Sequence, residues 1–99
     1  MQFKKGSVLY ARIGYKIEGE KLTDSIYQEH LTYVRSVARE RLLLGGGFSN
    51  AAGGMILFEA VDLDEAQEIV RSDPIIERGF YRCDLFVWEL AEVSLDRRR

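Results

Sequence analysis

The stretch FYRCDLFVWEL, residues 80–90, decides the fold of this chain. Successive side chains of a strand point to opposite faces, so the odd and even positions of this stretch predict the two faces of one strand. Both faces carry apolar groups, which indicates that both are covered in the folded protein. One face holds Tyr81, Cys83, Leu85 and Val87, and the other holds Phe80, Phe86, Trp88 and Leu90.

Three further segments are rich in strand-forming residues. Residues 7–13 predict the first strand, and residues 42–44, which three glycines follow, predict a short second strand. Residues 48–54 predict a turn. Residues 55–58, MILF, predict a third strand whose apolar residues do not alternate with polar ones, so this strand is also expected to be covered on both faces.

Two helices are expected between these strands. A capping box at residues 25–28 predicts a helix that begins at Ser25 and runs to about Arg41. A second capping signature at residues 62–65 predicts a helix that ends near residue 72, because a proline follows two positions later. The residues after this proline predict a helical turn or bend.

The resulting order is β-α-β-β-α-β, which predicts an α+β protein of the ferredoxin-like type. Right-handed crossovers give this order a four-stranded antiparallel sheet with two helices on one face. Two helices cover only one side of such a sheet, while the last two strands present apolar groups to both sides. We therefore expect a homodimer that forms through the open sheet face, as a dimeric α+β barrel.

Composition narrows the class of protein. The 99 residues make one domain over residues 1–99, and their 46% hydrophobic and 30% charged residues are typical of an ordinary globular protein. The formal net charge of −2 lacks the basic excess that a nucleic acid partner demands. No run approaches the roughly 18 apolar residues that cross a bilayer, so no membrane association is expected. Met1 leads into a strand-like segment without a secretory signal, and a single cysteine excludes an internal disulfide, which together favour the cytoplasm.

His30 is the only histidine, and it lies on the apolar face of the first predicted helix. Histidine exchanges protons readily near neutral pH, so any acid/base chemistry is expected to use His30. A general base needs an acceptor that orients its other ring nitrogen, and Asp73 is a candidate for that carboxylate. Each residue has a structural alternative: His30 as a hydrogen-bonded residue inside the fold, and Asp73 as the cap of the turn that follows it.

Other chemistry-bearing residues give weaker indications. The hydroxyl of Tyr10 or Tyr81 is a candidate to bind a polar ligand in a pocket between helix and sheet. Metal binding is disfavoured and no cofactor is expected, because one histidine and one cysteine far apart form no ligand cluster. Ser25 is better explained as a cap than as a nucleophile, and a thiol in mid-strand such as Cys83 is expected to be inert.

Several short motifs in this order resemble the YCII-related (YciI-like) family, and the similarity extends from the first strand to Trp88. They are His30-Leu31, Arg41-Leu42-Leu43-Leu44 before Gly46-Gly47, Glu65-Ala66, Ser72-Asp73-Pro74-Ile75-Ile76, and Gly79. The resemblance implies a ferredoxin-like fold that assembles as a dimeric α+β barrel. It also implies a catalytic centre made of His30 and Asp73.

The resemblance implies a small-molecule function. Relatives include a dehydrochlorinase that acts on chlorinated hydroxyhydroquinones, and muconolactone isomerase shares the barrel architecture. Where the family has Gly-Pro after the second strand, this chain has Gly47-Phe48, which are candidates for an altered pocket wall. We expect a proton-transfer enzyme that eliminates from or isomerises an aromatic or lactone-like substrate, and the alternative is a non-catalytic small-molecule-binding or structural homodimer.

Overall fold

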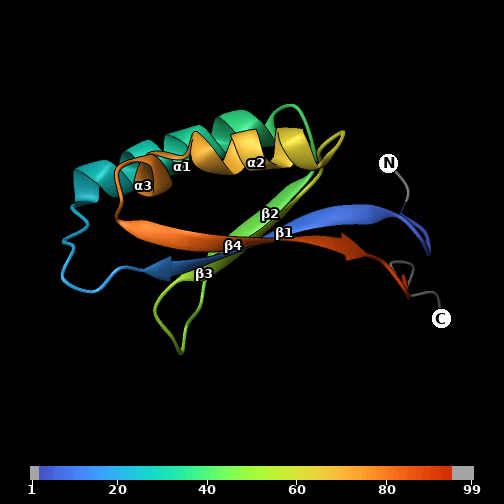
Figure 1. The fold of residues 1–99 in the computed structure, drawn as a ribbon, viewed down its shortest axis with the longest axis horizontal. Helices are drawn as coiled ribbons and strands as arrows, with labels where there is room; N and C mark the ends of the chain where they lie inside the picture. The colour runs from blue at the N-terminus through green and yellow to red at the C-terminus, as the bar shows by residue number, and fades with distance from the viewer. Residues whose placement is uncertain (1–2, 95–99) are drawn as a thin grey trace.

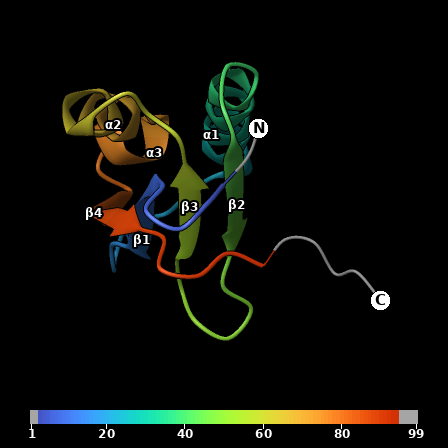
Figure 2. The same ribbon diagram turned by 90° about the vertical axis from the view of Figure 1, so that its right-hand side faces the viewer.

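The computed structural model describes residues 3–94 and contains one sheet and one layer of helices. The four strands are antiparallel and lie in the order β2-β3-β1-β4. The helices all lie on the same face of the sheet (Figures 1 and 2). The elements are β1 (Val8–Lys16), α1 (Asp24–Ala38), β2 (Leu43–Gly47), β3 (Gly54–Phe58), α2 (Leu63–Arg71), α3 (Pro74–Glu77) and β4 (Tyr81–Glu89). The predicted ferredoxin-like fold is therefore confirmed, and the expected turn or bend after residue 73 is the short helix α3.

The helix ends show which capping residues the chain uses. The side chain of Asp62 accepts a hydrogen bond from the Glu65 amide at 2.9 Å, so the predicted start of α2 is correct. The predicted cap of α1, Ser25, is wrong by two residues, and the helix begins at Asp24. Thr23, in extended conformation, accepts from the Ile26 amide at 3.2 Å and is the N-cap in place of Ser25.

Two strands are longer than their composition indicates. β1 continues past Gly14 to Lys16, which pairs with Tyr81 of β4. β2 includes the three glycines, because Gly47 pairs with Gly54 of β3. In both cases the neighbouring strand supplies the backbone partners that hold glycine in an extended conformation.

The core lies between the sheet and α2. It consists of Tyr10, Phe58, Ala66 and Val70, and the rings of Tyr10 and Phe58 lie with centroids 6.0 Å apart. The longer helix α1 contributes no fully buried residue, although its Tyr33 hydroxyl donates to the Ile69 carbonyl of α2. A loosely packed α1 leaves room between this helix and the sheet.

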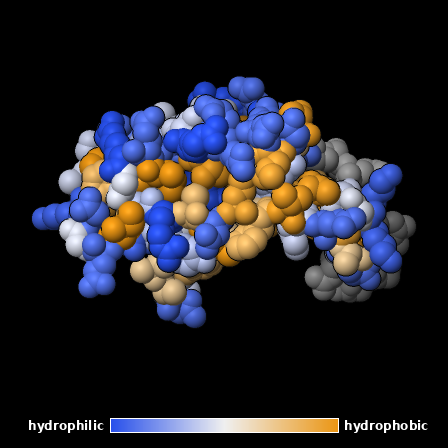
Figure 3. Space-filling model, viewed as in Figure 1, coloured by the Kyte–Doolittle hydropathy of each residue, from blue (hydrophilic) through white to orange (hydrophobic). Residues whose placement is uncertain are grey.

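The other face of the sheet carries no helix within residues 3–94 (Figure 1). Its exposed apolar side chains include Leu44, Phe86 and Trp88, at 59%, 50% and 46% of full exposure. Figure 3 shows apolar side chains gathered at the level of the sheet and hydrophilic ones over the helices. Within the described residues, no helix is long and apolar enough to span a membrane.

Candidate functional site

Asp73 is the centre of a buried polar cluster. It lies between α2 and α3, where the proline at position 74 restricts it to an extended conformation and occupies the first position of α3. Its side chain caps this helix, because Oδ1 accepts from the Ile75 amide at 3.1 Å. The expected capping role is therefore correct, and the side chain has no exposed surface.

The same carboxylate contacts His30 on α1. His30 Nδ1 lies 2.7 Å from Asp73 Oδ2 and 2.9 Å from Oδ1. An ionised carboxylate only accepts hydrogen bonds, so Nδ1 carries the proton in the neutral imidazole and Nε2 is the acceptor. The His30 side chain is 12% exposed, and His30 lines the cavity described below.

Arg12 of β1 completes the cluster. Its Nη1 donates to Asp73 Oδ2 at 2.7 Å, and the residue is 6% exposed. A buried guanidinium needs a negative partner, because moving either charge out of water is costly without the other. Asp73 is therefore the counter-charge of Arg12 inside the protein.

The charges of this cluster set the protonation state of Asp73. Burial by itself raises the pKa of the Asp73 carboxyl, but the hydrogen bond from His30 and the charge and hydrogen bond of Arg12 outweigh burial and lower it below its ordinary value. Burial and the negative charge of Asp73 both raise the pKa of the Tyr33 hydroxyl nearby. Asp73 is thus an anion at neutral pH.

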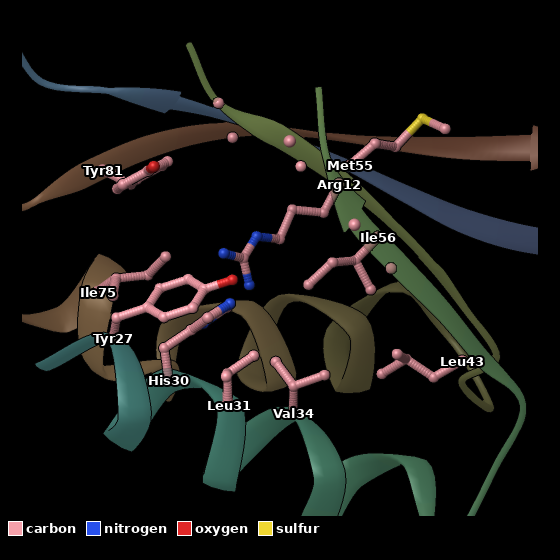
Figure 4. A pocket seen from close by; sticks show the side chains of 16 residues that line it. Arg12, Tyr27, His30, Leu31, Val34, Leu43, Met55, Ile56, Ile75 and Tyr81 are labelled. Carbon is pink, nitrogen blue, oxygen red and sulfur yellow. The ribbon is translucent and has the colours of Figure 1, made fainter. Parts of the chain in front are cut away.

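A cavity of about 200 Å³ lies between α1 and the sheet, and both His30 and Arg12 line it. Figure 4 shows the guanidinium of Arg12 extending from the sheet toward Tyr27 and His30 on α1. The rings of Tyr27 and His30 have centroids 5.7 Å apart. The remaining lining is mostly apolar side chains and glycine backbone, so the few polar groups converge in a largely apolar space.

Of the four residues that the sequence analysis named as ligand contacts, two line the cavity and two lie outside its lining. Gly47 and Tyr81 line the cavity. Tyr10 lies on the same face of β1 as Arg12 but packs into the core against Phe58, away from the cavity lining. Phe48 follows the end of β2 and is partly exposed, and it is also outside the lining.

Arg12 and Tyr27 are the two polar lining residues that the sequence analysis did not assign to a site. A charged residue in the middle of a strand-forming run is a usable signal for Arg12, since its neighbours in the run are apolar. Tyr27 lies three residues before His30, one helical turn away on the same face of α1. Within residues 3–94, no group of three His, Cys, Asp or Glu side chains is arranged to hold a metal ion.

The fold and the cavity define a class of protein: a ferredoxin-like domain with a small pocket beside a buried Arg-Asp-His cluster. Residues 8–89 match the YCII-related domain, and the chain belongs to this family, as its motifs predicted. The chain is 31% identical over 83 residues to the uncharacterized protein YjpA of Bacillus subtilis (strain 168). The match covers 83% of this chain and 98% of YjpA.

A solved structure has a similar fold. It is the 5-chloro-2-hydroxyhydroquinone dehydrochlorinase TftG from Burkholderia phenoliruptrix AC1100, in complex with 2,5-dihydroxybenzoquinone. The match has a TM-score of 0.64 and 20% sequence identity, and it covers 82% of this chain and 93% of TftG. At this identity the likeness concerns the fold.

Proposed function

We propose that this protein is an enzyme in which Nε2 of His30 takes a proton from a small ring compound bound in the cavity. The observation that carries the proposal is the contact of 2.7 Å between His30 Nδ1 and Asp73 Oδ2, which fixes the tautomer with Nε2 as the acceptor. Asp73 is the positioning residue, and it also stabilises the imidazolium that forms when His30 gains the proton. Gly47 and Tyr81 are the proposed ligand contacts among the residues named from the sequence.

The proposed reaction is an elimination or an isomerisation of an aromatic or lactone-like substrate. In an elimination, the electron pair of the broken bond to hydrogen forms a new double bond, and the leaving group departs with the pair of its own bond. In an isomerisation, His30 returns the proton to a different atom of the substrate. Membership of the YCII-related family and the dehydrochlorinase activity named for TftG support chemistry of this type.

The test is a screen of chlorinated hydroquinones, hydroxylated benzoates and lactones in D2O, in which NMR follows loss of the substrate proton and release of product. We expect His30→Gln to lower turnover by about 10²–10⁴-fold while ligand affinity changes little, which is the usual contribution of a general base. Asp73→Asn should also lower turnover, and it should alter the pH profile, which a merely structural loss would not do. Gln28→Ala, an exposed change on the same helix, is the matched control.

Two results would contradict the proposal. If His30→Gln keeps full turnover on a substrate that the wild type converts, His30 is not the base. If the wild-type protein binds ring compounds in the cavity but converts none of them, the non-catalytic binding alternative is correct.

We also propose that the active form is a homodimer joined through the open sheet face. The exposed Leu44, Phe86 and Trp88 support it, because a water-soluble monomer rarely leaves such an apolar patch uncovered. Sedimentation of Phe86→Lys should show a smaller species than the wild type, whereas Val61→Lys, at an 85% exposed position before α2, should sediment as the wild type does. A wild-type monomer of 11.4 kDa would contradict the dimer.

A cytoplasmic location also stays part of the proposal, on the basis of the single cysteine.

A further inference from the structure

Part of the cavity floor is glycine backbone, and the ring of Tyr81 lies beside it, with Cδ2 3.4 Å from where a Cβ of Gly14 would be. Gly14 of β1 pairs with Gly54 of β3, and Gly54 pairs in turn with Gly47 of β2. Directly paired residues of neighbouring strands point to the same face, so the three glycines form one row across the sheet. All three line the cavity that His30 also lines. The space between this glycine row and α1 is therefore a flat slot.

Arg12 has hydrogen-bond donors to spare at this slot. A guanidinium carries five N–H donors, and the structure shows one nitrogen, Nη1, bonded to Asp73. Nε and Nη2 make no hydrogen bond to any residue within the described range 3–94, although Arg12 is more than nine-tenths buried. Because the guanidinium projects into the space toward Tyr27 and His30 (Figure 4), an oxygen atom of a ligand there can accept from these donors.

The charges around the slot favour a negative ligand. Asp73 is fully buried, and its oxygens are occupied by Arg12, His30 and the Ile75 amide. Among the described residues, no Asp or Glu lines the cavity. Within residues 3–94, the guanidinium is therefore the only formal charge in the cavity lining when the imidazole is neutral, and this charge is positive.

The size of the cavity limits the ligand to one ring. A cavity of roughly 150 Å³ holds benzene in another protein. The 200 Å³ available here accommodates one such ring with a few small substituents.

We propose that the cavity binds a flat, single-ring anion, with the ring between the glycine row and α1 and its charged oxygen bonded to Arg12. Arg12 then determines the charge of the ligand, and the glycine row determines its thickness. That this ligand is the substrate rests on the function proposed above. The binding preference itself does not depend on His30 acting as a base.

The test measures binding of three probes by NMR titration of the wild-type protein. Benzoate is flat and negative, benzamide is flat and neutral, and cyclohexanecarboxylate is negative and thick. We expect benzoate to bind about tenfold or more tightly than each of the others, which corresponds to one charge-assisted hydrogen bond or one steric mismatch. Equal binding of benzamide overturns the charge preference, equal binding of cyclohexanecarboxylate overturns the flat slot, and no binding of benzoate overturns both.

Two variants localise the effect. Gly47→Ala adds a methyl group to the slot, and its nearest atom would be the Gly53 carbonyl oxygen at 3.7 Å, so the fold tolerates it while the ligand loses space. It should weaken benzoate binding about tenfold, whereas Ser49→Ala in the same hairpin, outside the cavity lining, should not. Arg12→Lys keeps the charge but loses the planar fork, so it should weaken benzoate binding while benzoate still binds more tightly than benzamide.

The variants also separate this inference from the proposed function. His30→Gln should keep the preference for benzoate, so a protein that shows the preference but no His30-dependent turnover refutes only the enzyme. If Arg12→Lys does not fold, the comparison of benzoate with benzamide in the wild type and the effect of Gly47→Ala still decide the inference. Unchanged benzoate binding in Gly47→Ala overturns the position of the ring.

Discussion

Asp73→Asn removes a negative charge from the buried cluster without changing its shape. The carboxylate is fully buried and 2.7 Å from Arg12 Nη1, so the change leaves the guanidinium without its counter-charge. Breaking a buried ion pair in this way costs about 3–5 kcal/mol. Asparagine is as good a helix cap as aspartate, so the bond to the Ile75 amide is retained and adds little to the cost. A loss of this size is a large part of the about 5–15 kcal/mol that stabilises a typical domain.

The assay is urea unfolding at pH 7, followed by tryptophan fluorescence at a fixed protein concentration. We expect the midpoint to fall with an unchanged slope, because the surface exposed on unfolding is the same. Asp64→Asn in the first turn of α2 is the matched control, since it removes an exposed carboxylate and should cost no more than about 0.5 kcal/mol.

The pH dependence gives the same experiment a second readout. The pKa of Asp73 is lowered in the folded state, so the unfolded chain binds the proton more readily than the folded one. The stability that the charged carboxylate contributes is complete above its unfolded pKa of about 3.9 and is lost as the pH falls through the lower folded value. The amide of the Asp73→Asn variant has no proton to gain, so the gap in stability between wild type and variant should narrow in acid. A cost below about 1 kcal/mol at pH 7, or a gap that stays constant down to acid pH, would refute the reasoning.

Three further outcomes can be measured on the purified protein. In urea unfolding, Gly54→Ala should destabilise the protein by about 1–3 kcal/mol, because its Cβ would lie 2.5 Å from the Gly46 carbonyl oxygen. Gly46→Ala is the control. Its Cβ would have no atom within 4 Å, so its stability should stay within about 1 kcal/mol of the wild type. Thr23→Ala should cost about 1 kcal/mol through loss of the α1 cap, and Ser25→Ala should cost clearly less; equal costs would argue against Thr23 as the cap. Burial raises the pKa of the Cys83 thiol, so iodoacetamide should modify it more slowly in the folded protein than in urea, and equal rates would contradict this.

The strand pattern of the sequence was sufficient to predict the fold. The strand-forming stretch at residues 80–90, which is apolar on both faces, and the short apolar run at 55–58 are strong local signals, and both strands form where expected. The start of α1 was not predictable with the same accuracy, because Thr23 and Ser25 are both good caps. The choice between them depends on where α1 packs, which residues close in sequence do not determine.

The sequence pointed to those residues of the candidate site whose type or local sequence is unusual in this chain. His30 stands out as the only histidine, and the aspartate at position 73 stands out because a proline follows it. Arg12 stands out as a charge within an apolar run, but its strand has apolar residues on both faces, and the pattern does not say which face meets the helices. The glycine row was also hidden, since it exists only through the pairing of three strands.

Tyr10 and Arg12 share one face of β1 but lie in different surroundings. Tyr10 points to the same side of β1 as Arg12, as the alternation requires, but two residues along a strand span about 6.6 Å. That displacement carries its ring past the cavity to Phe58 and the core. Residues that share one face of a strand can therefore have different partners.

Asp73 caps α3, is the counter-charge of Arg12 and contacts His30. Replacing Asp73 should therefore cost more stability than replacing His30. A lineage that abandons the chemistry can replace His30 at modest cost, since the imidazole is one partner among several. Any replacement of Asp73 by a neutral residue leaves the buried Arg12 without its counter-charge, and most replacements also remove the cap of α3. If the proposed chemistry is lost in a related protein, we therefore expect Asp73 to be retained longer than His30, so the aspartate alone would not indicate activity.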